Sequence, residues 1–411
     1  MSADRVPSGH SATRTPPTIP VTETLPAVAL ASDFLPTGPW IFGRQVELDG
    51  APPPDGSLVE VLDASRRFVG HALYNSRSDI RLRVLSRGKR TDLRSPRDFL
   101  LRTLAAADRL RKRTLRLPEV TTAYRIAHAE GDDLPGLIVD KLGDALVCEH
   151  HALGFWRLRD VVESALNELY PGLPVVHRVP DNAARAEHFD PEEPPLDLGE
   201  IDLVEHGLAF PVRPGFGHKT GWFCDQRDNR MQVAAYAKGV DVLDICTNAG
   251  GFALRAKQLG ARRVRGVDLD EVALERAQRA GRKNGLDVEW IHADGFDVLR
   301  SVRDDREKPG LVVLDPHKVV RSRMDLEQGL VKYNDWNTLA LSCVKPGGLL
   351  ATFSCSGAVD LPTFLGVVFQ SARRAGREIR LLDVLGASPD HPQRPEFPRS
   401  RYLKGALLAV D

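Results

Sequence analysis

Residues 242–252 read Val-Leu-Asp-Ile-Cys-Thr-Asn-Ala-Gly-Gly-Phe, a short apolar run that ends in small and polar residues. Such a run bounded by a Gly-Gly pair is typical of a buried strand that turns tightly into a helix. The same pattern returns further along the chain, with strands expected at 241–245, 263–267, 288–292, 311–314 and 349–354 and helices beginning near Gly250, Asp270, Asp325 and Asp360. Alternation at this spacing predicts a doubly wound, Rossmann-like α/β domain with a parallel sheet covered on both faces.

Acidic and small residues gather where the first three of these strands end. Ligands of open parallel sheets bind beyond the carboxyl ends of the strands, near the switch point. The loop after the first strand lacks the spacing G-x-G-x-x-G, which argues against a dinucleotide. An acid at the end of that strand suits a cationic methyl donor better than a pyrophosphate, so we predict S-adenosylmethionine (SAM), with an ordinary tight turn as the alternative. The candidate cofactor residues at these strand ends are Asp244, Thr247, Asn248, Ala249, Gly250, Gly251, Phe252, Asp268, Leu269, Asp294 and Gly295.

Two later strands end in residues that could react. The fourth is followed by Asp315-Pro316-His317-Lys318, and another ends in Ser354-Cys355-Ser356-Gly357. A thiolate at Cys355 could add to carbon 6 of a cytosine and so make carbon 5 nucleophilic toward a methyl group. The alternative is that Cys355 is a small buried core residue. The candidate catalytic residues are therefore Cys355, Asp315, His317 and Lys318.

The remaining sequence indicates three further segments. Residues 1–32 are rich in Pro, Ser and Thr and are expected to be a disordered leader. Residues 33–116 combine short β-signals with a helix opened by Ser95-Pro96, and suggest a small barrel followed by a helix. Residues 117–212 contain strand-like runs around a helix near 156–169 and suggest a small central β-rich α+β domain, which leaves 213–411 as the α/β domain.

Composition narrows the class of protein. The 411 residues are 42% hydrophobic and 27% charged, as in a soluble globular chain, and no apolar run approaches the length of a membrane span. The five cysteines are scattered, which argues against a disulfide framework and a zinc site and fits a reducing, cytoplasmic location. We expect no metal and no membrane partner, while a homodimer is left open.

Several longer motifs point to one family. They include Gly38-Pro39-Trp40-Ile41-Phe42 near the start, the run from Glu130 to Asp140, Lys219-Thr220-Gly221-Trp222-Phe223-Cys224-Asp225-Gln226-Arg227, and Lys332-Tyr333-Asn334-Asp335, Asp390-His391-Pro392 and Tyr402-Leu403-Lys404. Together they resemble the ribosomal large-subunit RNA cytosine-5 methyltransferase I family over nearly all of the chain after residue 33. The resemblance implies a PUA domain, a central domain and a SAM-dependent methyltransferase domain.

The resemblance also implies residue roles. Cys355 would be the nucleophile, Asp315 would orient the pyrimidine, and Lys219, Thr220, Asp225 and Arg227 would belong to the segment that leads into the donor site. Three residues depart from the family pattern: His317 replaces a proline, His218 a glutamine and Ala249 a threonine. His317 adds a titratable group beside the expected target base and could remove its proton, or could only alter a loop contact.

A local excess of positive charge predicts an RNA partner. Between Arg81 and Arg116 there are thirteen Lys and Arg against three Asp, although the chain as a whole is neutral. The alternative is a solvated helix face, partly paired with the acidic stretch 190–197. Large-subunit ribosomal RNA is the implied substrate. Two other functions stay open: a methyltransferase that acts on a base nitrogen, and a non-catalytic RNA-binding ribosome-assembly factor.

Overall fold

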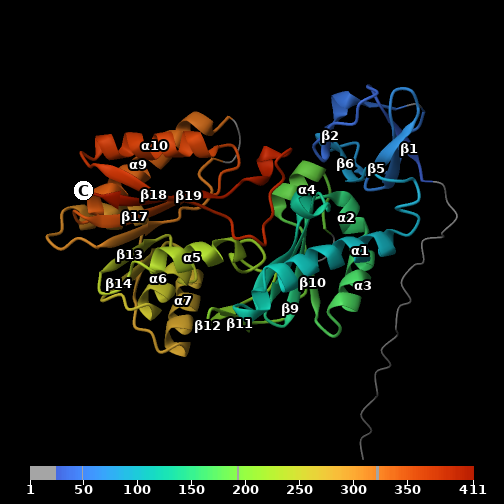
Figure 1. Ribbon diagram of the computed structural model, residues 1–411. Helices are drawn as coiled ribbons and strands as arrows, with labels where there is room; N and C mark the ends of the chain where they lie inside the picture. The colour runs from blue at the N-terminus through green and yellow to red at the C-terminus, as the bar shows by residue number, and fades with distance from the viewer. Residues whose placement is uncertain (1–24, 49, 192–193, 321–323) are drawn as a thin grey trace, which may run out of the picture.

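The computed structural model describes residues 25–48, 50–191, 194–320 and 324–411. Figure 1 shows three units: a β-rich unit in blue, a cyan and green unit beside it, and a larger α/β unit from yellow to red. A red segment near the C-terminal end of the sequence reaches from the third unit back to the second. Within the described residues, no helix is long and apolar enough to cross a membrane.

The first unit is a six-stranded, barrel-like sheet in the order β2-β6-β5-β4-β1-β3. Its strands are β1 (Ala27–Leu30), β2 (Trp40–Phe42), β3 (Val46–Glu47), β4 (Leu58–Leu62), β5 (Phe68–Tyr74) and β6 (Ile80–Ser86). The prediction that order begins at Asp33 is wrong, because β1 lies earlier and pairs with both β3 and β4. Val28 and Leu30 enter the barrel core, which explains why this short Pro-flanked stretch is ordered. The rest of the predicted leader, residues 1–24, lies outside the described residues.

The central unit is built on the sheet β10-β9-β8-β7. Its strands are β7 (Ala123–His128), β8 (Leu137–Leu142), β9 (Ala145–His150) and β10 (Val175–Arg178), with helices α2 (Leu153–Arg157), α3 (Arg159–Leu169) and α4 (Asp181–Glu187). The helix expected near 156–169 is thus two helices that meet at Leu158. A hairpin of β11 (Ile201–Glu205) and β12 (Leu208–Val212) follows.

Helix α1 (Pro96–Arg109) joins the first unit to the second. The Ser95 hydroxyl accepts from the Asp98 N–H at 3.2 Å, which confirms the predicted N-cap. Its apolar residues Phe99, Leu100 and Leu104 lie in the core of the central unit, although the sequence assigned this helix to the barrel domain. The helix continues as one π-turn over Leu110–Thr114, and Arg111 of that turn is fully buried.

The third unit holds a seven-stranded sheet in the order β15-β14-β13-β16-β17-β19-β18. Its strands are β13 (Val242–Ile245), β14 (Val264–Asp268), β15 (Glu289–His292), β16 (Leu311–Leu314), β17 (Gly348–Ser354), β18 (Ile379–Gly386) and β19 (Lys404–Val410). The five strands predicted from the sequence are all present and parallel. β19 runs antiparallel between β17 and β18, and neither β18 nor β19 was predicted.

Helices cover both faces of this sheet, as predicted. The core on one face includes residues of α5 (Arg227–Ala234), α6 (Gly251–Gln258) and α7 (Glu271–Lys283). The core on the other face includes residues of α8 (Gly295–Arg303), α9 (Leu326–Cys343) and α10 (Leu361–Arg374). Figure 1 shows these two layers on either side of the strands. The chain order therefore reverses between β13 and β16, which places the switch point at their carboxyl ends.

Candidate functional site

The loop after β13 is held in a conformation that depends on glycine. Gly250 has φ +80°, and a Cβ at this position would stand 2.5 Å from the Trp290 side chain. Cys246 and Asn248 also have positive φ, at 62° and 48°. The backbone therefore curls tightly between β13 and α6, and there is no room for a side chain at its tip.

Asp244, the last but one residue of β13, is fully buried, and one of its carboxylate oxygens lacks a hydrogen-bond partner among the described residues. One carboxylate oxygen accepts from the Thr247 hydroxyl at 2.5 Å and from the Ala253 N–H at 3.1 Å. The other, Oδ1, is buried without a partner among the described residues. Burial raises the pKa of Asp244 to about 7. A buried acceptor beside a loop that ends in two glycines fits a cationic, hydrogen-bonding ligand such as the amino acid end of SAM.

The predicted acids converge on one place. Burial raises the pKa of the Cys246 thiol, and the charges of Asp268, Asp315, Asp244 and Asp294 all raise it further. These carboxylates, from the ends of four strands, therefore surround the same loop. Asp268 is anchored there, since it accepts from the Asn248 N–H at 2.7 Å and the Asp270 N–H at 2.9 Å. Asp294 is exposed and caps α8 by accepting from the Phe296 N–H at 2.7 Å.

The other predicted loop residues fall into two groups. Ala249 and Phe252 are buried in the apolar core, so their side chains support the loop. Leu269 is 65% exposed at the end of β14. The two glycines lie where side chains would clash: a Cβ on Gly251 would stand 2.5 Å from Arg230, and one on Gly295 would stand 2.9 Å from Ile245 and Trp336.

Asp315 and Cys355 follow the adjacent strands β16 and β17. The Gln226 amide donates to Asp315 at 2.9 Å, and burial, followed by the charge of Asp225, raises the pKa of Asp315 to about 6. Cys355 is half-buried. Burial and then Asp315 raise the pKa of its thiol, while the charges of Lys219 and Lys318 lower it. The thiol therefore lies among charged groups at the strand ends and not in the hydrophobic core.

A turn from another part of the chain completes this end of the site. Lys219 pairs with the buried Asp225 at 2.5 Å, and the Tyr402 hydroxyl donates to the same carboxylate oxygen at 2.6 Å. Asp225 Oδ1 is buried and has no partner among the described residues. The 3₁₀ turn Cys224–Gln226 thus brings a carboxylate and an amide against the ends of β16 and β17.

Two of the residues predicted to bind the cofactor make hydrogen bonds within the protein. The buried Thr220 hydroxyl donates to Asp140 of the central unit at 2.6 Å. The buried Arg227 guanidinium donates to both oxygens of Asp390 at 3.0 and 3.1 Å. These hydrogen bonds fasten the motif that contains Thr220 and Arg227 to the central unit and to Asp390.

His317 and Lys318 are exposed beside Asp315. His218 is also exposed, and its Nε2 lies 3.8 Å from Oδ2 of Asp270. Gln226 and Tyr402 were missed as site residues, although both lie within motifs that the sequence analysis quoted. No strand-end rule selects them, because neither follows a strand of the parallel sheet.

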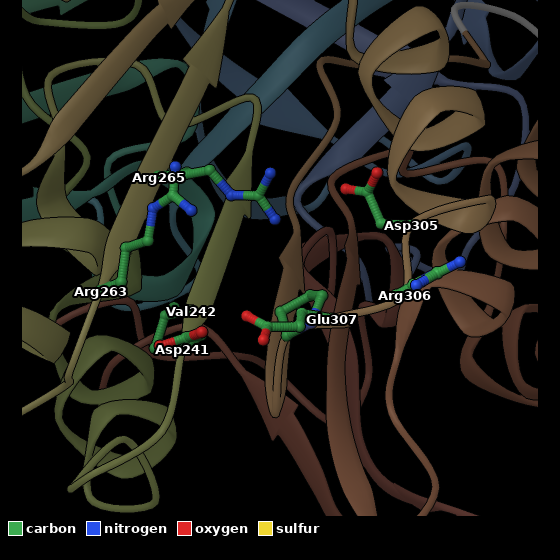
Figure 2. A pocket seen from close by; sticks show the side chains of 8 residues that line it. Asp241, Val242, Arg263, Arg265, Asp305, Arg306 and Glu307 are labelled. Carbon is green, nitrogen blue, oxygen red and sulfur yellow. The ribbon is translucent and has the colours of Figure 1, made fainter.

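A separate cavity of about 250 Å³ lies at the opposite edge of the sheet. Its lining comes from the beginnings of β13 and β14 and from the residues before β16, so it is far along the strands from the loop after β13. Figure 2 shows Arg263 and Arg265 on one side of this cavity and Asp305 and Arg306 on the other. Since ligands of such sheets bind at the carboxyl ends, this cavity is not the predicted site.

Comparisons with known proteins agree with this architecture. A PUA-like domain model matches residues 35–87, and a model of the S-adenosylmethionine-dependent methyltransferases matches residues 173–400. Ribosomal RNA large subunit methyltransferase I of Aeromonas salmonicida is 36% identical over 380 residues, which cover 90% of this chain and 94% of that protein. The protein of the same name from Photobacterium profundum is 35% identical, with 90% and 95% covered.

Solved structures show the same fold. The crystal structure of a methyltransferase complexed with SAH has a TM-score of 0.76 and 18% identity, and covers 94% of this chain and 100% of that chain. The three-unit architecture is therefore shared at low sequence identity. With its PUA-like barrel, its α/β sheet and relatives matched over nearly their full length, the chain belongs to the ribosomal RNA large subunit methyltransferase I family of S-adenosylmethionine-dependent methyltransferases.

Proposed function

We propose that this SAM-dependent RNA methyltransferase forms 5-methylcytosine in large-subunit ribosomal RNA, with Cys355 as the nucleophile. The observation that carries the proposal is the placement of a half-buried thiol and a half-buried carboxyl group at the ends of two adjacent strands. A methyltransferase that acts on a base nitrogen needs no thiol at this place. The names of the relatives support ribosomal RNA as the substrate.

The residues present can carry each protein step of cytosine methylation. The Cys355 thiolate adds to carbon 6. Asp315 in its protonated form transfers its proton to N3, which neutralises the negative charge that develops on the ring. Carbon 5 then attacks the methyl group, which SAM supplies when bound. A base removes the carbon-5 proton, and elimination of the Cys355 thiolate restores the double bond, as the N3 proton returns to Asp315.

Asp315 suits the acid role because of its pKa. A carboxyl with a pKa of about 6 is partly protonated near neutral pH, whereas an ordinary Asp is not. His317 and Lys318 lie exposed two and three residues after Asp315, and His317 is our candidate for the base that removes the carbon-5 proton. Burial and the charge of Asp315 raise the pKa of the Cys355 thiol, and the charges of Lys219 and Lys318 act in the opposite direction.

RNA would be bound mainly by the first two units. Nine of the cations between Arg81 and Arg116 are exposed: Arg87, Lys89, Arg90, Arg94, Arg97, Arg102, Arg109, Arg113 and Arg116. In the acidic stretch considered as a partner for this run, Asp197 pairs with Arg213 instead. Arg90 pairs with Glu60 and Arg97 with Glu168, and the other exposed cations are the ones we expect to meet an RNA backbone. The target cytosine must be unpaired or flipped out to reach the strand ends.

Replacing Cys355 tests the proposal directly. Wild type, Cys355→Ala and, as a matched control, Cys148→Ala of the central unit are incubated with labelled SAM and unmodified large-subunit ribosomal RNA, and the labelled nucleoside is identified. We expect 5-methylcytosine from wild type and the control, and a loss of more than about 10⁴-fold in the Cys355 variant. An RNA with 5-fluorocytosine should trap wild type covalently. Near-normal turnover by Cys355→Ala, or label on a base nitrogen, would overturn the proposal.

A further inference from the structure

We infer that Asp390 is a positioning residue for methyl transfer, which acts through Arg227 and Gln226 on Asp315. This inference rests on the proposed function, because it assumes that Asp315 belongs to the reacting site. Asp390 lies in the segment 387–403 between β18 and β19, which we call the strap. In Figure 1 the strap is part of the red segment that reaches toward the central unit.

Asp390 is the fully buried anion of the strap. Both of its carboxylate oxygens accept from the Arg227 guanidinium, at 3.0 and 3.1 Å, and Oδ2 also accepts from the Arg125 N–H at 2.9 Å. Arg227 is 1% exposed, so this two-bonded pair is shielded from water. A planar guanidinium held by two bonds has little orientational freedom. The first residue of α5 is thereby fixed in place.

The strap also holds the turn that precedes Arg227. Ser388 donates to the Asp225 carbonyl through its N–H at 2.9 Å and through its hydroxyl at 3.0 Å. The Ser388 hydroxyl accepts from the Asp228 N–H at 3.1 Å. At the other end of the strap, Tyr402 donates to the Asp225 carboxylate. Residues 225–228 are therefore fastened to the strap from three strap positions.

Gln226 is the member of this turn that meets Asp315. Its amide nitrogen donates to Asp315 at 2.9 Å, and its amide oxygen accepts from Asn229 at 2.5 Å. Asn229 also donates to the Gly386 carbonyl at 2.8 Å, directly before the strap. The amide is thus oriented with its donor toward Asp315. This hydrogen bond lowers the pKa of Asp315 against the stronger effect of burial.

Asp390 is also tied to the helix that carries the predicted RNA surface. The Asp390 carbonyl accepts from Arg111 at 2.7 Å, and Arg111 also donates to both oxygens of Asp132 at 2.7 Å. Arg111 lies in the π-turn that extends α1. One strap residue therefore joins the RNA-side helix, the central sheet and the turn at Asp315. A displacement of that turn by about 1 Å can lower a reaction rate about 10²-fold.

A double-mutant cycle tests this role in the full-length protein. Asp390→Asn, Gln226→Ala and the double variant are compared by kcat and by the pH dependence of kcat/KM for RNA methylation. We expect each single variant to lose about 10²-fold in kcat, and the double variant to be no worse than Gln226→Ala alone. Loss of the Gln226 hydrogen bond should also move the pKa assigned to Asp315 upward in both single variants. Losses that multiply in the double variant would overturn the inference.

A separate variant controls for a loss of activity that only follows from a loss of stability. Glu187→Gln also replaces a buried carboxylate with an amide, opposite Arg83 at 2.9 Å, but it lies between the barrel and the central unit. It should lower thermal stability and leave kcat unchanged. An equal loss of kcat in this control would show that activity only follows stability, and would overturn the inference. If Asp390→Asn does not fold, Arg227→Lys keeps the charge, removes the two-bonded geometry and enters the same cycle.

The outcome is distinguishable from failure of the proposed function. If Cys355→Ala is inactive but the cycle is multiplicative, the role of Asp390 alone is refuted. If Cys355→Ala remains active, the proposed chemistry is refuted whatever the cycle shows.

Discussion

Asp244 connects cofactor affinity to pH through a single buried carboxylate. Its pKa of about 7 means that it is largely protonated below neutrality, and its Oδ1 has no donor among the described residues. A cationic ligand favours the ionised form, so binding must release a proton when the pH is below that pKa. The dissociation constant for SAM should therefore fall with rising pH by up to about tenfold per unit until about pH 7, and then level off.

Calorimetry in buffers of different ionisation enthalpy would detect this proton release. The matched variant Asp244→Asn should bind more weakly and lose the pH dependence. The apoprotein should show the opposite trend in stability, because a raised carboxyl pKa destabilises the fold as pH climbs from about 4 to 7. Binding without proton uptake or release at pH 6 would contradict the assignment.

The sequence located the site residues that directly follow strands of the parallel sheet, but it did not locate those that lie elsewhere in the chain. Asp244, Asp268 and Asp315 meet because carboxyl ends of parallel strands share one edge, which is a rule of geometry. Gln226 reaches Asp315 across 89 residues of sequence, and Tyr402 reaches Asp225 across 177. Local periodicity does not encode contacts between residues so far apart in the sequence. For the same reason, the sequence could not show that Thr220 and Arg227 make hydrogen bonds within the protein.

At the scale of elements, the β13–α6 loop should be intolerant of any side chain at its tip. Gly250→Ala adds both the cost of a positive φ and a clash with Trp290, and should reduce stability by about 1–3 kcal/mol and weaken SAM binding. Gly285→Ala is the matched control, because Gly285 has φ +64° but nothing within 4 Å of a Cβ. Chemical denaturation and SAM titration of both variants would check this. Equal SAM affinity in the two would count against the loop as the cofactor site.

Helix α1 should supply much of the RNA affinity. Arg102 and Arg109 of α1 and Arg113 of the π-turn that extends it are all exposed. Changing all three to Gln should weaken RNA binding and lower the slope of log affinity against log salt by about one unit for each phosphate that is no longer neutralised. Arg262→Gln with Arg263→Gln, at the far edge of the α/β sheet, serves as the control. An unchanged salt slope would place the RNA elsewhere.

Element prediction succeeded where the hydrophobic period was regular. The parallel strands and the capped α1 were found, whereas β18 was not, because its side chains are mostly exposed and it lacks a buried alternation. β1 was hidden in a Pro-rich segment, since only three of its residues enter the core. The interruption at Leu158 carries no Pro or Gly to announce it.

For the whole molecule, the junction at Arg111 should contribute strongly to stability. Arg111→Gln leaves Asp132 without its cation and removes the donor to the Asp390 carbonyl, and should lower the free energy of unfolding by about 3–5 kcal/mol. Arg113→Gln, two residues further and exposed, should change it by less than about 0.5 kcal/mol. Urea unfolding with several probes would compare them. Similar losses for both would mean that the buried network contributes little.

The order and class of the three units could be predicted, but the contacts that hold them together could not. Composition and motif order separated a barrel, a central unit and an α/β unit. The hydrogen bond between Arg111 and Asp390 spans 279 residues and joins two segments of ordinary composition. Only the folded chain shows that the strap, which connects the last two strands, also contacts the central unit.

The strap therefore links the catalytic unit to the first two units through contacts that the domain boundaries in the sequence do not reveal. Anyone who recombines this protein with a relative by cutting near residue 213 would transfer Asp390 with one parent and its partners Arg111 and Arg125 with the other. Because Asp390 contacts residues on both sides of such a cut, a hybrid should work best when the two parents have the same residues at positions 111, 227 and 390.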